Sequence, residues 1–339
     1  MRLGLYGCGN RSRHLVKSVA GEVRVTACYD ADPARAQQTA ETHGGRAYDA
    51  LDAFLEASEV DAFVVSLFPR HHAEAARRVA ATGKSMYLEK PIGVSSAEAE
   101  AVVEAVREHK VVCHVGFLHR YVPVFERLTQ MIDAGELGEL LGVNIDWLTL
   151  AGAAVRGEVD NWRGDPATGG ELVQHLGHTL DLLRVWGGDI ERVCAMSHRA
   201  LWPKSPSENQ VSALMRYREC PAIVNVQQSL VSHHYMNKGR VEGSEATVEY
   251  EWWTESVIRV YRCDGETGPP GLREPSRVIG DLEPYAPGGA TDGRMMRDFL
   301  AAARGERPVA VTAEDGLAAL RLSEAIRRSA DTGEPVMLD

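Results

Sequence analysis

The stretch Arg2-Leu3-Gly4-Leu5-Tyr6-Gly7-Cys8-Gly9-Asn10-Arg11-Ser12 decides the fold of the first part of this 339-residue chain. An apolar run that is typical of a buried strand leads into a glycine-rich turn, and a helical pattern follows to about Val19. Gly7 allows the tight turn. Gly9 lets the backbone approach a pyrophosphate, which the amino terminus of the helix stabilises with free N–H groups and its dipole. The stretch therefore predicts the opening strand, turn and helix of a dinucleotide-binding fold.

The remaining residues of the turn are less typical. Asn10 and Arg11 are candidate cofactor-binding residues because they open the helix. Ser12 stands where the usual motif has a third glycine, so we expect close packing of helix on strand to be strained rather than excluded. The glycines alone are weak evidence, and a Rossmann-like scaffold that binds no phosphate stays an alternative.

Asp30 is the candidate residue for distinguishing NAD from NADP. It ends the second predicted strand, Val23 to Tyr29, and lies 21 residues after Gly9 (30 − 9). A carboxylate at this position can accept hydrogen bonds from the adenosine ribose hydroxyls and repels a 2′-phosphate. The sequence therefore favours NAD over NADP, although Arg35 nearby leaves the preference open.

Two patterns of secondary structure divide the chain. Up to residue 120, short apolar strands alternate with helices, which predicts a parallel, doubly wound sheet covered on both faces. Beyond residue 121, successive strands follow one another without intervening helices between residues 193 and 261, which predicts a mainly antiparallel open sheet. The expected architecture is an α/β Rossmann domain over residues 1–120 and an α+β domain over residues 121–339.

Composition and charge exclude several classes of function. With 37 basic and 48 acidic residues, the formal net charge is −11, which argues against a nucleic-acid partner. No apolar run approaches the roughly 20 residues that span a bilayer, and a strand starting at Arg2 leaves no room for a signal peptide. We therefore expect a cytoplasmic protein without a membrane partner.

The segment Glu89-Lys90-Pro91, together with the glycine turn, resembles the Gfo/Idh/MocA family of sugar dehydrogenases. Further segments agree along the whole chain: Ser66 to His72, Gly116-Phe117 with Arg120-Tyr121, Trp162-Arg163 with Gly169-Gly170, and Leu182-Leu183. The resemblance implies an enzyme that acts on CH–OH groups and uses the second domain's sheet to form homodimers or homotetramers. It also implies that Ser66, Pro69, His72, Glu89 and Lys90 contact the cofactor.

Lys90 and His178 are the candidate catalytic residues. Lys90 follows a sheet strand at its carboxyl end, where open α/β sheets bind ligands; a solvated ion pair with Glu89 is the alternative. His178 matches the family's general acid/base, a role that suits imidazole because its pKa lies near neutrality. The family commonly carries an acid four residues earlier, where this chain has Gln174. An amide cannot relay a proton, so either Lys90 and His178 suffice or the substrate is unusual.

The resemblance places Tyr121, Trp162, Arg163 and Gln174 in the substrate pocket, and a surface charge is the alternative for Arg163. No complete set of metal ligands is visible, and we expect no metal. The expected reaction is hydride transfer between NAD and a secondary alcohol of a sugar, inositol or related polyol. Two alternatives stay open: an NAD-dependent glycosidase or lyase that uses transient oxidation, and a regulator that senses NAD without turnover.

Overall fold

A computed structural model describes residues 1–150, 170–201, 207–253, 255–262 and 274–338. The chain forms two compact units, residues 1–118 with 286–321 and residues 119–285 with 322–339. The predicted single boundary at residue 120 therefore needs correction, because the chain returns to the first unit. Helix α8 (Ala290–Ala303) is responsible: its buried residues Met295, Met296 and Phe299 give it an apolar face, and it packs on α1 (Asn10–Ser18).

The first unit is built on a six-stranded parallel sheet. The strands are β1 (Arg2–Tyr6), β2 (Arg24–Tyr29), β3 (Arg46–Ala47), β4 (Ala62–Val65), β5 (Ser85–Leu88) and β6 (Cys113–Val115). Their order is β3-β2-β1-β4-β5-β6, so the chain starts in the middle of the sheet and winds outward in both directions. This confirms the predicted doubly wound sheet. The two-residue strand β3 was not predicted.

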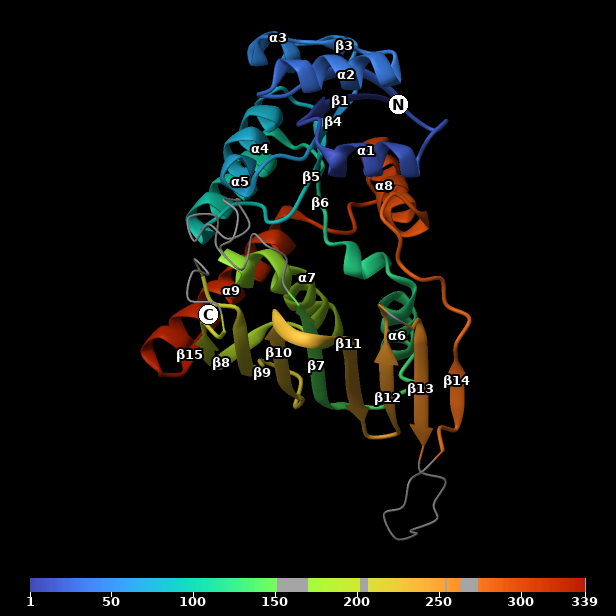
Figure 1. The fold of residues 1–339 in the computed structure, drawn as a ribbon, viewed down its shortest axis with the longest axis vertical. Coiled ribbons are helices and arrows are strands. Elements are labelled where there is room, and N and C mark those ends of the chain that lie inside the picture. Colours follow the sequence, from blue (N-terminus) through green and yellow to red (C-terminus); the bar gives the residue numbers. More distant parts are fainter. Residues whose placement is uncertain (151–169, 202–206, 254, 263–273, 339) are drawn as a thin grey trace. The chain divides into compact units, whose positions relative to one another are not determined.

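Helices cover both faces of this sheet. Helices α4 (His72–Ala81) and α5 (Ser96–His109) pack together on one face, whereas α1 and α8 lie on the other (Figure 1). Helix α2 (Pro33–His43) begins at Asp32, whose carboxylate accepts a hydrogen bond from Ala34 N at 3.1 Å. The unit is completed by α3 (Leu51–Leu55), the 3₁₀ turn η1 (Pro69–His71) and the first part of α9 (Ala313–Thr332).

The second unit contains a nine-stranded sheet of order β14-β13-β12-β11-β7-β10-β9-β8-β15. The strands are β7 (Leu140–Leu150), β8 (Ile190–His198), β9 (Gln210–Tyr217), β10 (Ile223–Ser229), β11 (Val231–Gly243), β12 (Ala246–Glu251), β13 (Val257–Arg262), β14 (Arg277–Ile279) and β15 (Val336–Met337). All neighbours are antiparallel except β7 and β10, which run parallel. The predicted α+β architecture is confirmed.

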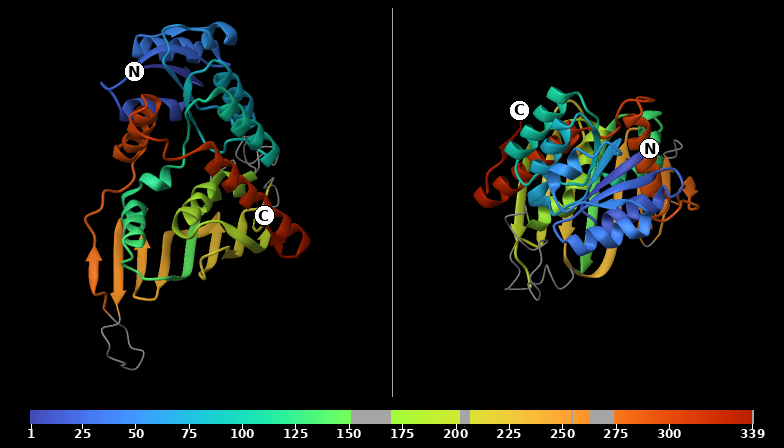
Figure 2. Two further views of the ribbon diagram at one scale, coloured as in Figure 1. Left: turned by 180° about the vertical axis from the view of Figure 1, so that it is seen from behind. Right: turned by 90° about the horizontal axis from the view of Figure 1, so that it is seen from above.

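One face of this sheet is covered and the other is open. Buried and exposed residues alternate along β9 and β10, as expected of a strand with one solvated face. Helices α6 (Pro123–Asp133) and α7 (Gly170–Gly187) lie on the covered face (Figure 2). Nowhere in the described ranges does a helix combine the length and the apolarity that crossing a membrane demands.

Candidate active site

The glycine turn leaves the amino terminus of α1 open. Gly7 has φ +95°, and a Cβ there would collide with the carbonyl oxygen of Ser66, so glycine is required at this position. Gly9 caps α1 in an extended conformation without any side-chain hydrogen bond, and a Cβ on it would meet nothing within 4 Å. The first N–H groups of α1 are thus available to an anion, as in phosphate-binding helices.

Ser12 fits the position of the absent third glycine. Its side chain is fully buried, and its hydroxyl donates a hydrogen bond to the carbonyl oxygen of Gly7. This hydrogen bond therefore stabilises the glycine turn, and the serine side chain fits between α1 and β1.

Asp30 is held by the backbone on both sides of its carboxylate. One oxygen accepts a hydrogen bond from Cys8 N at 2.8 Å, and the other accepts one from Asp32 N at 2.9 Å. Arg35 lies 3.4 Å from the second oxygen. These contacts fix the carboxylate at the carboxyl end of β2, directly beside the glycine turn, where it can accept further hydrogen bonds through its remaining lone pairs.

Arg11 and Glu89 form a buried charge network that the sequence did not predict. Arg11 Nε lies 2.6 Å from Glu89 Oε1, and Arg11 Nη1 lies 2.8 Å from Asp292 Oδ1 of α8. Tyr87 donates a hydrogen bond to Glu89 at 2.7 Å, and Asp292 also accepts one from Gly288 N. We name Arg11, Tyr87, Glu89 and Asp292 the Arg11 network.

Electrostatics keep the network ionised. Burial raises the pKa of the Glu89 carboxyl, but the charge of Arg11 and hydrogen bonds from Arg11 and Tyr87 outweigh burial and leave that pKa below its ordinary value. Burial alone lowers the pKa of the Arg11 guanidinium, and the charge of Glu89 reverses the effect, so its pKa rises. Glu89 is thus a fixed anion beside Lys90.

Lys90 follows β5, and its backbone N–H donates to Glu89 Oε2 at 3.2 Å. The Lys90–Pro91 peptide bond is cis. His72 connects this segment to the one after β4: its Nδ1–H donates to the carbonyl oxygen of Pro91 at 2.6 Å, and its Nε2 accepts a hydrogen bond from Leu67 N at 3.4 Å. Burial lowers the pKa of His72, so its imidazole is neutral and holds together the segments that follow β4 and β5.

The structure brings most of the predicted cofactor residues into one region of the first unit. Ser66 N bonds to the carbonyl oxygen of Tyr6, which places the segment after β4 beside the glycine turn. Pro69 begins η1 and is buried. Asn10 is exposed at the start of α1.

His178 lies in the second unit, in the middle of α7, among buried aromatic rings. The ring of His119, from the 3₁₀ turn η2 (Leu118–Tyr121), stacks on it with centroids 4.8 Å apart and planes at 26°. Arg120 of η2 forms a two-point ion pair with Asp181 of α7, at 2.8 and 2.5 Å. Asp181 is fully buried, so this pair joins η2 to α7 and Asp181 has a structural role.

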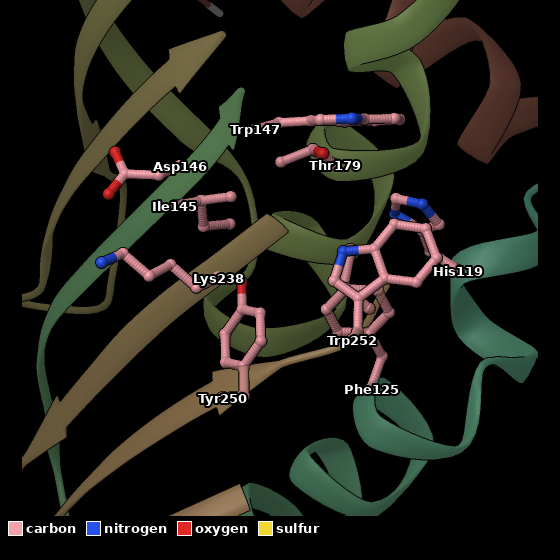
Figure 3. A pocket seen from close by; sticks show the side chains of 10 residues that line it. His119, Phe125, Ile145, Asp146, Trp147, Thr179, Lys238, Tyr250 and Trp252 are labelled. Atoms are coloured by element: carbon pink, nitrogen blue, oxygen red, sulfur yellow. The ribbon is translucent and has the colours of Figure 1, made fainter. Parts of the chain in front are cut away.

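A pocket in the second unit adjoins His178. Its lining comes from η2, α6, α7 and strands β7, β11 and β12 (Figure 3) and includes His119, Trp147, Thr179, Lys238 and Trp252. The sequence analysis did not identify His119, which lies between Phe117 and Arg120. Nothing in the sequence pattern indicates that its ring contacts α7. Among the described residues, no three His, Cys, Asp or Glu side chains gather in a way that could hold a metal.

Several predicted substrate residues are not placed. Trp162 and Arg163 lie outside the described residues, and Gln174 belongs to α7 without a described side chain. Tyr121 ends η2, beside Arg120. Lys90 belongs to the first unit and His178 belongs to the second.

Comparisons with known proteins agree along the chain. Residues 1–117 match an oxidoreductase family with an NAD-binding Rossmann fold, and residues 129–338 match an oxidoreductase family C-terminal alpha/beta domain. An inositol 2-dehydrogenase of Rhizobium meliloti is 28% identical over 337 residues, 97% of this chain and 96% of that protein. A D-xylose 1-dehydrogenase (NADP(+)) of Haloferax volcanii is 28% identical over 99% of this chain and 98% of its own length.

A solved structure shares the fold. Levoglucosan dehydrogenase in complex with NADH superimposes with a TM-score of 0.88, covering 100% of this chain and 99% of its own, at 19% identity. At that identity the likeness concerns the arrangement of elements alone.

Proposed function

The chain belongs to the Gfo/Idh/MocA family of oxidoreductases, and on that premise we propose that it transfers a hydride between NAD and a secondary alcohol of a sugar, inositol or related polyol. The observation that carries the proposal is the open glycine turn with Asp30 beside it, in the same unit as Lys90. Full-length similarity to an inositol dehydrogenase and to a xylose dehydrogenase supports the substrate class.

The first unit fits a dinucleotide. The uncapped start of α1 and the open space beside Gly9 suit a pyrophosphate, and Asp30 suits the ribose hydroxyls. We assign cofactor contacts to the turn from Gly7 to Ser12 and to Asp30, Ser66, Pro69, His72, Glu89 and Lys90. When bound, the nicotinamide supplies the hydride acceptor or donor.

The preference for NAD over NADP is part of the proposal. Asp30 is a carboxylate held toward the glycine turn by two backbone N–H groups, and a 2′-phosphate there would meet a like charge. Arg35 lies 3.4 Å from Asp30 and could favour the phosphate if it moved away. Because Asp30 is fixed and Arg35 is an exposed, flexible side chain, we expect the carboxylate to dominate.

In the proposed reaction, Lys90 and His178 handle the substrate proton. Lys90 donates a hydrogen bond to the reacting hydroxyl oxygen, and the Glu89 carboxylate holds its backbone N–H. His178 accepts the hydroxyl proton as the hydride leaves carbon. Gln174 orients the substrate or His178 and carries no proton, and Tyr121, Trp162 and Arg163 complete the substrate contacts.

We also propose that the open face of the second unit's sheet joins copies of the chain into a homodimer or homotetramer. Met196, Leu214 and Ile223 lie on the neighbouring strands β8, β9 and β10 and are 80%, 55% and 62% exposed. Such a gathering of exposed apolar side chains marks an interaction surface. We place the assembly in the cytoplasm and assign it no nucleic-acid partner, in keeping with the net charge of −11.

The function is tested by screening inositols, aldoses and other polyols for NADH formation by absorbance. Wild-type enzyme should reduce NAD with at least one of them. Lys90→Ala and His178→Ala should each lower kcat at least about a hundredfold, since general acid–base groups contribute roughly 10² to 10⁴ in rate. NADH binding, followed by its fluorescence, should change little in His178→Ala. Turnover that survives both substitutions would contradict the proposed roles.

A further inference from the structure

The stacking of His119 on His178 is the feature that the proposed mechanism does not use. Both rings are nearly inaccessible to solvent, at 2% and 6% exposure, and their centroids are only 4.8 Å apart. His119 comes from η2 and His178 from α7, so the contact joins two elements rather than neighbours on one helix. Two titratable rings therefore share a single buried site.

Aromatic neighbours hold His119 in place. Its ring lies 4.8 Å from the ring of Trp252, 4.9 Å from that of Phe125 and 5.6 Å from that of Trp147 (Figure 3). The ion pair of Arg120 with Asp181 fixes the backbone of η2 against α7 at the next residue. His119 therefore cannot turn away from His178 without disturbing this packing, and the apolar surroundings solvate added charge poorly.

The charged groups near the two histidines include both signs. Asp181 is engaged by Arg120, and Asp146 and Lys238, of opposite charge, line the same pocket as His119. His175 of α7, Tyr250 of β12 and Tyr121 of η2 are further titratable side chains on the elements that carry or surround the pair. One turn before His178 the helix carries an amide, Gln174, and no carboxylate. The described ring that stacks on His178 is thus a second titratable imidazole.

We propose that His119 is a positioning residue for His178: its ring holds the His178 imidazole in one orientation, and the stacked pair, neutral before the reaction, takes up one proton and not two. The proposal rests on the assigned role of His178 as general base. At an effective dielectric constant of about 20, repulsion between two unit charges at this separation pushes the second protonation about 2.5 pH units below the first. A neutral His119 presents its ring face to the imidazolium that forms when His178 takes the substrate proton.

Proton uptake by the two rings tests the charge part of the proposal without any substrate. We would label the histidines of the full chain with ¹³C and ¹⁵N and follow the imidazole signals of His119 and His178 from pH 8 to pH 5. The signals are identified by comparison with His119→Phe and His178→Phe, and His198→Phe, which removes an exposed imidazole of the same unit, is the control.

In the wild type, the fractional protonations of His119 and His178 should sum to one and level off. In His119→Phe, His178 alone should take up one proton, and His198→Phe should leave both curves in place. A sum of two in the wild type would overturn the proposal, because the rings would then titrate independently. A sum of zero would overturn it too, because burial rather than the partner ring would keep them neutral.

Kinetics test the positioning part. His119→Phe keeps a flat ring against His178, whereas His119→Ala removes it, so kcat should fall about tenfold further in the alanine variant with little change in KM. The fall of kcat at low pH should follow a single ionisation in His119→Phe and in the wild type alike, because the wild-type pair takes up one proton. Equal losses in the two variants would overturn the positioning role. Full turnover by His178→Ala would instead refute the proposed general base, whatever the proton count.

Discussion

Replacing Arg11 by methionine should destabilise the protein far more than the same change at Arg2. Both arginines have an ion-pair distance of 2.6 Å to a carboxylate, Glu89 and Asp61 respectively. Arg11 is 24% exposed and Arg2 is 49% exposed, and the Asp292 carboxylate that Arg11 also contacts is fully buried. Because Arg11→Met leaves two buried carboxylates without their cation, it should cost about 3 to 5 kcal/mol at pH 7. The exposed Arg2 pair contributes much less, since water and salt screen it.

The cost of Arg11→Met should depend on pH in a defined direction. In the wild type the pKa of Glu89 lies below its ordinary value, so the pair contributes stability above pH ~4.3 that disappears as the pH falls through the folded pKa. In the variant, the charge of Arg11 no longer opposes the effect of burial, so the Glu89 carboxyl should protonate more readily. The difference in free energy of unfolding should therefore narrow between pH 7 and about pH 4.

Urea unfolding followed by far-UV circular dichroism measures this difference. The six tryptophans all lie between residues 147 and 253, so their fluorescence reports the second unit and would miss a change confined to the first. If Arg11→Met costs no more than Arg2→Met, or if the gap stays constant from pH 7 to pH 4, then the network is not the buried, ionised cluster described here.

Three further substitutions test other parts of the account. Asp30→Ala should narrow an expected preference of at least tenfold for NADH over NADPH, measured by cofactor fluorescence, because the carboxylate no longer opposes a 2′-phosphate; an unchanged ratio would remove Asp30 from that role. Thr312→Ala removes the hydroxyl that accepts from Asp315 N at 3.1 Å and should cost about 0.5 to 2 kcal/mol in the urea assay; no loss would show that the capping box is dispensable. Leu214→Glu puts a charge on the open sheet face and should shift the mass in light scattering toward the 37.1 kDa of one chain; a wild type already at that mass would exclude the proposed oligomer.

Much of the fold could be predicted because its signals are local. The apolar run before Gly7 predicted β1 and the start of α1, and Asp32 caps α2 directly before Pro33. Thr312 and Asp315, three residues apart, form a capping box at the start of α9 through two reciprocal hydrogen bonds. In each case the residues that decide the structure lie within a few positions of one another.

Contacts between distant segments could not be predicted in the same way. Arg11 and Asp292 are 281 residues apart, and no periodicity in the sequence relates them. The return of the chain to the first unit was therefore not predicted. The parallel pairing of β10 with β7 likewise depends on which strands become neighbours. His119 met His178 only through the packing of η2 on α7, whereas Lys90 and His178 stood out through a resemblance in sequence.

The most direct test of the proposed function is the fate of the hydrogen on the substrate carbon. A substrate found in the NADH screen would be deuterated at its reacting CH–OH carbon and incubated with NAD. The mass of the reduced cofactor would then be measured by mass spectrometry. The wild type should produce NADH one mass unit heavier, and Lys90→Ala and His178→Ala should do so at least about a hundredfold more slowly. Unlabelled NADH, or labelled NADH formed at an undiminished rate by both variants, would contradict the account.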